Sequence, residues 1–116
     1  MNDSILITIK KLLGIGESDT AFDTDIIIGI NSVFNILLQL GVGPDSGFSI
    51  ADATTLWSDY LADMSKLEMV KSYIYMKVRL MFDPPSTGSL MDALKAQIAE
   101  LEWRLNVQVD PGEEDE

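Results

Sequence analysis

The stretch that decides the fold runs from Phe22 to Pro44 and reads FDTDIIIGINSVFNILLQLGVGP. No charged residue lies between Asp25 and Asp45, although 23% of the chain is charged. Three explanations are open for such a stretch: a membrane segment, a helix buried in a core, or a helix that packs against other copies of the chain. The spacing of the apolar residues narrows this choice.

The apolar residues of this stretch recur with the period of an α-helix and form two neighbouring rows. The first row is Ile26, Ile30, Val33, Leu37 and Leu40, and the second is Ile27, Phe34 and Leu38. The start offers three capping side chains, Asp23, Thr24 and Asp25. Two glycines and a proline, Gly41, Gly43 and Pro44, are expected to end the helix. The pattern therefore predicts a helix with a wide apolar surface.

A membrane span needs about 20 mainly apolar residues. This helix is shorter and contains one glycine and four polar residues, namely Gly29, Asn31, Ser32, Asn35 and Gln39. We therefore do not expect it to cross a membrane. A helix that is apolar on most sides is buried on most sides. In a chain of 116 residues, part of that surface is expected to meet another copy or a partner, and the core of a monomer is the equal alternative.

Three further helices are indicated by apolar stripes. The first, capped by Asp3 or Ser4 and ended by Gly14, carries Ile5, Ile9, Leu12 and Leu13. The next, within residues 66–85, carries Leu67, Val70, Ile74, Val78 and Met81 and is stopped by Pro84 and Pro85. The last, within residues 89–106, carries Leu94, Ile98, Leu101 and Leu105 and is opened by a capping box of Ser89 and Asp92.

The predicted fold is all-α, a small bundle of about four main helices with a long loop between the second and the third. That connection, from Gly41 to Ser65, contains Trp57, Tyr60 and Leu61, which indicate one or two extra helical turns. We expect a single helical domain over residues 1–109, in which Val107 and Val109 suit a short strand or an extended arm. Residues 110–116 are nearly all acidic and are expected to form a disordered tail.

The composition gives little support to catalysis. The chain contains no cysteine and no histidine, so thiolate chemistry and the usual neutral-pH base are absent. No phosphate loop, HExxH or GxSxG pattern occurs. The spacing of the carboxylate pairs does not indicate a catalytic or metal site. We therefore expect no enzyme activity, no cofactor and no metal site.

The net charge of −11 argues against binding nucleic acid through phosphate neutralisation. Four of the eight basic residues lie on the third main helix, but they do not form one tight row; they are Lys66, Lys71, Lys77 and Arg79. We expect them to form ion pairs with acidic surfaces of the same or a neighbouring subunit, such as Asp59, Asp63 or the tail.

Four stretches in order, FDTDIIIGINSVFNILLQLGVGP, GFSI, LEMVKSYIYMKVRLMFDPP and ELEWRLN, resemble the small head–tail connector proteins of tailed bacteriophages, also called head-completion or adaptor proteins. The resemblance covers roughly residues 3–109. It implies a mainly helical, non-enzymatic virion protein that is made in the bacterial cytoplasm. It also implies a ring, matched to a twelve-fold portal, that extends the DNA channel and offers a platform to the next connector or tail protein. DNA would be passing cargo only.

On this interpretation the uncharged helix and the basic helix supply the two faces of a head-to-tail subunit interface. The predicted interface residues are Ile27, Phe34, Leu38, Lys71, Lys77 and Arg79. The predicted residues for docking to the portal or a neighbour are Trp57, Trp103, Leu105, Val107 and Val109, of which Leu105 to Val109 are expected to order on assembly. Trp57 and Trp103 have core roles as their alternatives. An acidic regulator that binds a host protein or mimics DNA, a monomeric bundle and an enzyme with an unrecognised metal site remain the rival functions.

Overall fold

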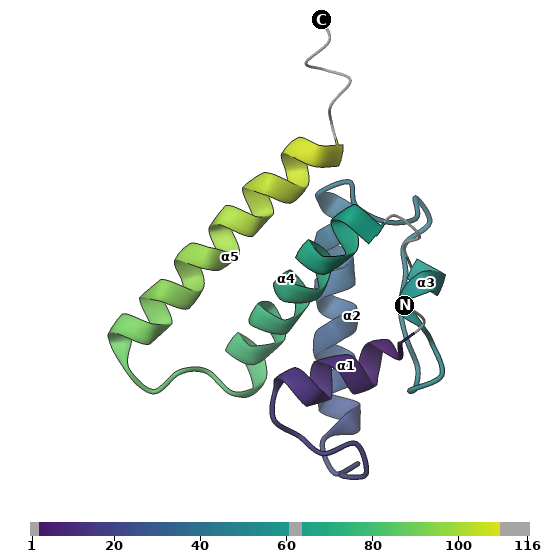
Figure 1. Ribbon diagram of the computed structural model, residues 1–116, viewed down its shortest axis with the longest axis vertical. Coiled ribbons are helices and arrows are strands. Elements are labelled where there is room, and N and C mark those ends of the chain that lie inside the picture. Colours follow the sequence, from purple (N-terminus) through teal and green to yellow (C-terminus); the bar gives the residue numbers. More distant parts are fainter. Residues whose placement is uncertain (1–2, 61–63, 110–116) are drawn as a thin grey trace, which may run out of the picture.

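The computed structural model describes residues 3–60 and 64–109, and this part of the chain is folded into helices without a β-strand (Figure 1). The helices are α1 (Ile5–Leu12), α2 (Asp23–Gln39), α3 (Trp57–Tyr60), α4 (Met64–Phe82) and α5 (Gly88–Val109). The predicted all-α fold with four main helices is confirmed. So is the short helical segment that was expected within the long connection.

The centre of the molecule is the pair formed by α2 and α4, which share the most extensive contact between helices. Helix α1 lies across both of them near one end, and α5 packs on α4 (Figure 1). The described part of the long connection, residues 41–60, runs along the opposite side from α5. This arrangement leaves one long side of α5 uncovered.

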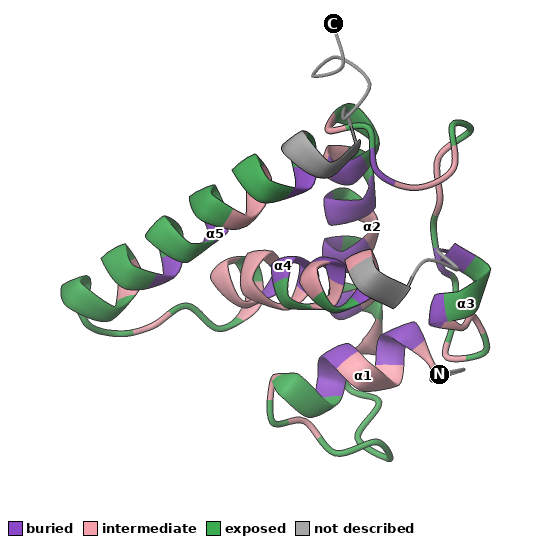
Figure 2. Ribbon diagram, turned by 45° about the horizontal axis from the view of Figure 1, so that its top comes forward, coloured by how far each residue is buried: buried purple, intermediate pink, exposed green. Residues whose placement is uncertain are grey.

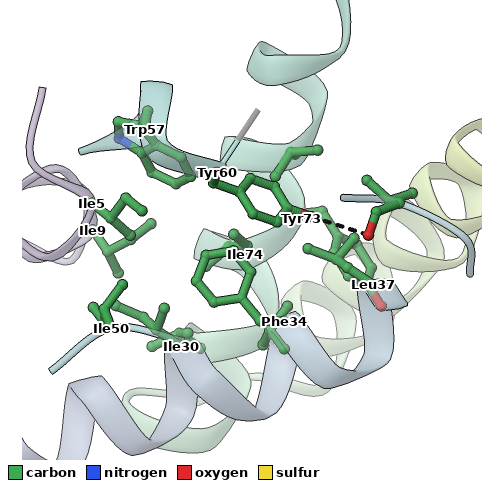
Figure 3. Close-up of a cluster of buried hydrophobic side chains, with 14 of the residues drawn as sticks. Ile5, Ile9, Ile30, Phe34, Leu37, Ile50, Trp57, Tyr60, Tyr73 and Ile74 are labelled. Carbon is green, nitrogen blue, oxygen red and sulfur yellow. Dashed lines mark hydrogen bonds between the residues drawn. The ribbon is translucent and has the colours of Figure 1, made fainter. Parts of the chain in front are cut away.

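The buried side chains lie mainly where α1, α2, α4 and the long connection meet (Figures 2 and 3). The first predicted row of α2 supplies much of this core, because Ile26, Ile30, Val33 and Leu37 have no exposed surface. From the second row Phe34 is also buried, whereas Leu38 is 37% exposed. The uncharged stretch is therefore covered largely by its own chain.

Of the three predicted helix caps, one is confirmed and two are wrong. The hydroxyl of Ser4 caps α1 as expected, accepting a hydrogen bond from the Ile7 amide at 3.3 Å. Helix α2 has no side-chain cap. Helix α5 begins two residues earlier than the Ser89 capping box requires, and the hydroxyl of Thr87 accepts from the Leu90 amide at 3.4 Å.

Two residues that were expected in the buried stripes are exposed. Leu12 is 48% exposed and Met81 is 52% exposed. Both lie in the last turn of their helix. In α1 the predicted Ile5 and Ile9 are buried, together with Leu6 and Lys10, which the predicted stripe did not include.

The end of α5 differs from the predicted strand or extended arm, since the helix continues through Val107 to Val109. The first helix-breaking residues of this region are Pro111 and Gly112, so nothing earlier in the sequence stops the helix. The segment from Leu105 to Val109 is therefore helical in the single chain, and its ordering on assembly stays a prediction. The predicted disordered tail lies outside the described residues.

The long connection is held against α2 by Asn31. The side-chain amide of Asn31 donates to the Ile50 carbonyl at 3.0 Å, and its oxygen accepts from the Ile50 amide at 2.8 Å. A second attachment joins the connection to the start of α1, where the Ile5 amide donates to the Thr55 carbonyl at 3.1 Å. These hydrogen bonds attach the long connection firmly to α2 and α1.

Replacing Asn31 by alanine is expected to lower the free energy of unfolding by about 1–3 kcal/mol, because both backbone groups of Ile50 lose their partner. Urea unfolding followed by circular dichroism measures this change. Asn35 lies one turn later on the same helix but is exposed, so Asn35→Ala is the matched control and should cost less than about 0.5 kcal/mol. Equal effects of the two variants would show that Asn31 does not hold the long connection in place.

Candidate interaction surfaces

The described residues contain no cluster of three or more His, Cys, Asp or Glu side chains that is arranged to hold a metal ion. Among the same residues, no helix combines the length and the apolar character that crossing a membrane requires. The features of the structure that bear on function are its surfaces.

Three of the predicted interface or docking residues lie in the core of the single chain. Trp57 and Leu105 have no exposed surface and Phe34 has 2%. The indole N–H of Trp57 donates to the Thr8 hydroxyl at 3.0 Å, which ties the connection to α1. Of the two roles left open for Trp57, the structure supports the core role. In this conformation none of the three side chains has surface to offer a partner.

The other predicted apolar residues reach the surface to different degrees. Trp103 is 67% exposed, the largest fraction among the exposed large apolar side chains of the described residues. Leu38 is 37% exposed and Ile27 is half-buried. The side chains of Val107 and Val109 lie outside the description. Trp103 is thus the predicted residue with the most surface available to a partner.

The basic residues of α4 make contacts within their own chain. Lys71 lies 3.6 Å from Glu68 Oε2, and its ammonium group lies 5.5 Å from the centre of the Trp57 ring. Its side chain is only 14% exposed, so its main effect is to cover the buried indole. Within its own chain Lys71 thus pairs with Glu68, and the expected pairing of the basic residues with acidic surfaces of a neighbouring subunit stays a prediction.

Arg79 sits in the last turn of α4 and contacts the end of that helix. Its Nε donates to the Asp83 carbonyl at 3.4 Å, and its Nη1 donates to the Tyr75 hydroxyl at 3.4 Å. A cation at this place also meets the negative end of the helix dipole. Lys77 is half-buried. Arg79 therefore stabilises the end of α4, and its predicted place in a subunit interface remains a prediction.

Helices α4 and α5 are joined by a buried tyrosine. The hydroxyl of Tyr73 donates to Glu102 Oε2 at 2.7 Å. Burial, and then the hydrogen bond to the Glu102 carboxylate, raises the pKa of Tyr73 well above its ordinary value. The hydroxyl therefore stays protonated at neutral pH and keeps donating, which fixes the position of α5 on α4.

A surface that the sequence analysis missed lies between the first half of α2 and the end of α4. We call it the Gly29 groove, and it is lined by Asp25, Ile28, Gly29, Ser32, Val78, Met81 and Phe82. Ile28 is 59% exposed, and it belongs to neither apolar row of α2. Phe22 lies at its edge, with its ring edge-to-face on Phe82 at 5.3 Å between centroids. The sequence signal for this groove was Ile28, an apolar residue of α2 that lies outside both predicted rows.

Comparison with models of protein families matches residues 5–112 to the phage connector protein family. Searches of curated proteins and of solved structures each gave no match. The family match spans all five helices and most of the chain. It confirms the resemblance that rested on the four sequence stretches. The chain therefore belongs to the phage connector protein family.

Proposed function

We propose that this protein is a head–tail connector that assembles as a ring beneath the portal of its phage. The observation that carries the proposal is the family match over residues 5–112, together with a fold of helices only in the described residues. Membership gives a structural role in the phage connector. We propose three further features that go beyond family membership. They are the ring, its twelve-fold match to the portal, and the docking of a further connector or tail protein.

The exposed apolar surfaces of the chain suit assembly from identical subunits. Subunits in a ring meet head to tail, so each copy must present two different surfaces that fit each other. The Gly29 groove on α2 and α4 is one apolar surface, and the outer side of α5 with Trp103 is another. Because these surfaces lie on different helices, one copy can offer each of them to a different neighbour.

The charge of the chain suits a channel through which DNA passes. A net charge of −11 repels phosphate, so DNA is not held by the wall. The contacts of Lys71 and Arg79 within their own chain leave less basic surface for binding phosphates. We therefore propose that DNA is cargo and that the bound partners are proteins. No part of this function requires catalysis, so we propose no enzyme activity.

The end of α5 is the proposed docking element for the portal or for a neighbouring copy. It contains Trp103 and continues to Val109 as a helix. An exposed aromatic side chain on a rigid helix is the type of anchor that carries much of the binding energy in protein interfaces.

Virion incorporation tests the proposed function against its rivals. Purified particles of the encoding phage are analysed by quantitative mass spectrometry, and a phage with a stop codon in this gene is examined by electron microscopy. We expect several copies in each wild-type particle and, in the mutant, heads that lack tails. A protein that is absent from particles but present in infected cells would contradict the connector and favour the acidic regulator.

A further inference from the structure

Gly29 lies in the middle of α2, where glycine is less favourable than alanine. It is buried against α4, but no contact within its own chain requires a glycine there. A Cβ atom at this position would lie 3.7 Å from Val78 Cγ2 and 3.7 Å from the sulfur of Met81, which are ordinary contact distances. Its backbone is helical, so it does not need the left-handed freedom of glycine. Gly29 is itself buried, and its missing side chain leaves the floor of the Gly29 groove lower beside Val78 and Met81.

The walls of the Gly29 groove are suited to a flat aromatic side chain. Met81, which is 52% exposed, brings a thioether, and sulfur packs favourably against aromatic rings. Phe82 brings an aromatic ring on the same side, and Ile28 adds an aliphatic wall that is 59% exposed. An indole ring laid on the glycine floor would bury all these exposed apolar surfaces at once.

The chain itself carries an uncovered indole on another helix. Trp103 projects from the side of α5 that is opposite to its buried stripe of Leu94, Ile98 and Leu105. The residues beside it on that side include Ala96 and Ala99, which are small and exposed. Small neighbours let another helix approach closely, so that the indole can reach into a groove.

Trp103 is remote from the groove of its own chain. The end of α5 lies at the end of α2, where the side-chain amide of Asn106 donates to the Leu40 carbonyl at 3.5 Å. The groove lies along the first half of α2, from Asp25 to Ser32. The two surfaces therefore lie toward opposite ends of α2, and a contact between them joins two copies.

Charge also favours a second copy at this place. Copies with a net charge of −11 repel each other, so they are expected to meet where acidic residues are few or are opposed by basic ones. The groove has one charged lining residue, the exposed Asp25. Arg104 follows Trp103 directly and pairs with Glu100 at 2.6 Å, and Lys95 lies exposed two turns earlier on α5 without a salt bridge among the described residues. Lys95 can face Asp25 of the neighbouring copy, and the pair of Arg104 with Glu100 adds no net charge beside Trp103.

We propose that Trp103 of one copy inserts into the Gly29 groove of the next and that this contact forms the subunit interface. The proposal rests on the proposed function, in which copies assemble. Because the two surfaces differ, the contact is heterologous and repeats from copy to copy, closing into a ring where the rotation allows.

Cysteine cross-linking tests this contact, since the chain contains no cysteine of its own. One double variant carries Ser32→Cys with Ala99→Cys, and a second carries Asp25→Cys with Ala99→Cys. These pairs cover the two directions in which α5 can cross the groove. Each variant is treated with a short bismaleimide, alone and on portal particles of its phage. The matched control is Ser32→Cys with Ser58→Cys, in which the second cysteine lies exposed on α3.

We expect a ladder of linked oligomers from one of the two double variants and no ladder from the control. Copies that associate in native mass spectrometry without giving such a ladder would overturn this interface while leaving the connector function intact. Copies that do not associate, either alone or on the portal, would overturn both proposals.

The variant Gly29→Ala separates blocking of the groove from damage to the fold. The added methyl group would lie at ordinary contact distance from Val78 and Met81, so it is tolerated by the chain itself and raises the floor of the groove that these residues line. We expect at least a tenfold weaker association, with a thermal unfolding midpoint that is unchanged or raised. Association equal to that of the wild type would contradict the insertion of Trp103.

Discussion

Replacing Trp57 by alanine is expected to lower the free energy of unfolding by about 3–5 kcal/mol. The side chain has no exposed surface and packs beside Ile5, Ile9 and Tyr60 (Figure 3). Its loss leaves a cavity between α1 and the long connection, and it also removes the hydrogen bond to the Thr8 hydroxyl. Urea unfolding followed by circular dichroism measures the loss, and the variant is expected to be partly unfolded already at 37 °C.

The matched control is Trp103→Ala, which removes the same side chain from an exposed position. We expect it to change the free energy of unfolding by less than about 0.5 kcal/mol. Similar losses in the two variants would contradict the assignment of Trp57 to the core and of Trp103 to an interaction surface.

Replacing Asp23 by alanine is expected to lower the free energy of unfolding by about 3 kcal/mol, because it leaves the charge of Lys10 buried without its partner. The side chain of Lys10 is 2% exposed, and its Nζ lies 2.9 Å from Asp23 Oδ1. That oxygen has no hydrogen bond of good geometry, so the contact is an ion pair. The ammonium group also donates to the Glu17 carbonyl at 3.1 Å, which fixes the segment between α1 and α2.

Two variants control for other effects of this change. Asp25 stands in the same first turn of α2 but is exposed, so Asp25→Ala should cost less than about 1 kcal/mol. The double variant Lys10→Met with Asp23→Ala removes both charges and is expected to recover most of the loss. If the double variant is as unstable as Asp23→Ala alone, the buried charge of Lys10 is not the cause.

Local patterns predicted the helices well because burial follows the helical period. The residues Ile26, Ile30, Val33 and Leu37 were placed on the buried side of α2 from spacing alone, and all four have no exposed surface. The ends marked by Gly41 and by Pro84 were also correct, since these residues limit the backbone directly.

Contacts between distant segments were not predictable in the same way. The residues around Lys10 in the sequence do not indicate that its side chain is buried and pairs with Asp23. Asn31 was seen only as part of a polar seam, although it binds the backbone of Ile50, which is nineteen residues away. Such pairs depend on how the helices pack, and that packing cannot be predicted from local patterns in a single sequence.

The interaction surfaces were predicted only in part, for the same reason. Phe34, Trp57 and Leu105 are as apolar as any interface residue, and only the packed structure shows that the chain covers them itself. Met81 belonged to a predicted core stripe and instead lines the Gly29 groove. Trp103 was assigned to docking or to the core, and its exposure supports docking.

Native mass spectrometry of the purified protein, alone and mixed with the portal of its own phage, tests the connector role most directly. The account predicts a closed oligomer or a portal complex with a fixed number of copies. It also predicts that Trp103→Ala loses this assembly while remaining folded. A protein that stays monomeric and does not bind the portal would contradict the account and would leave its exposed apolar surfaces to a different partner.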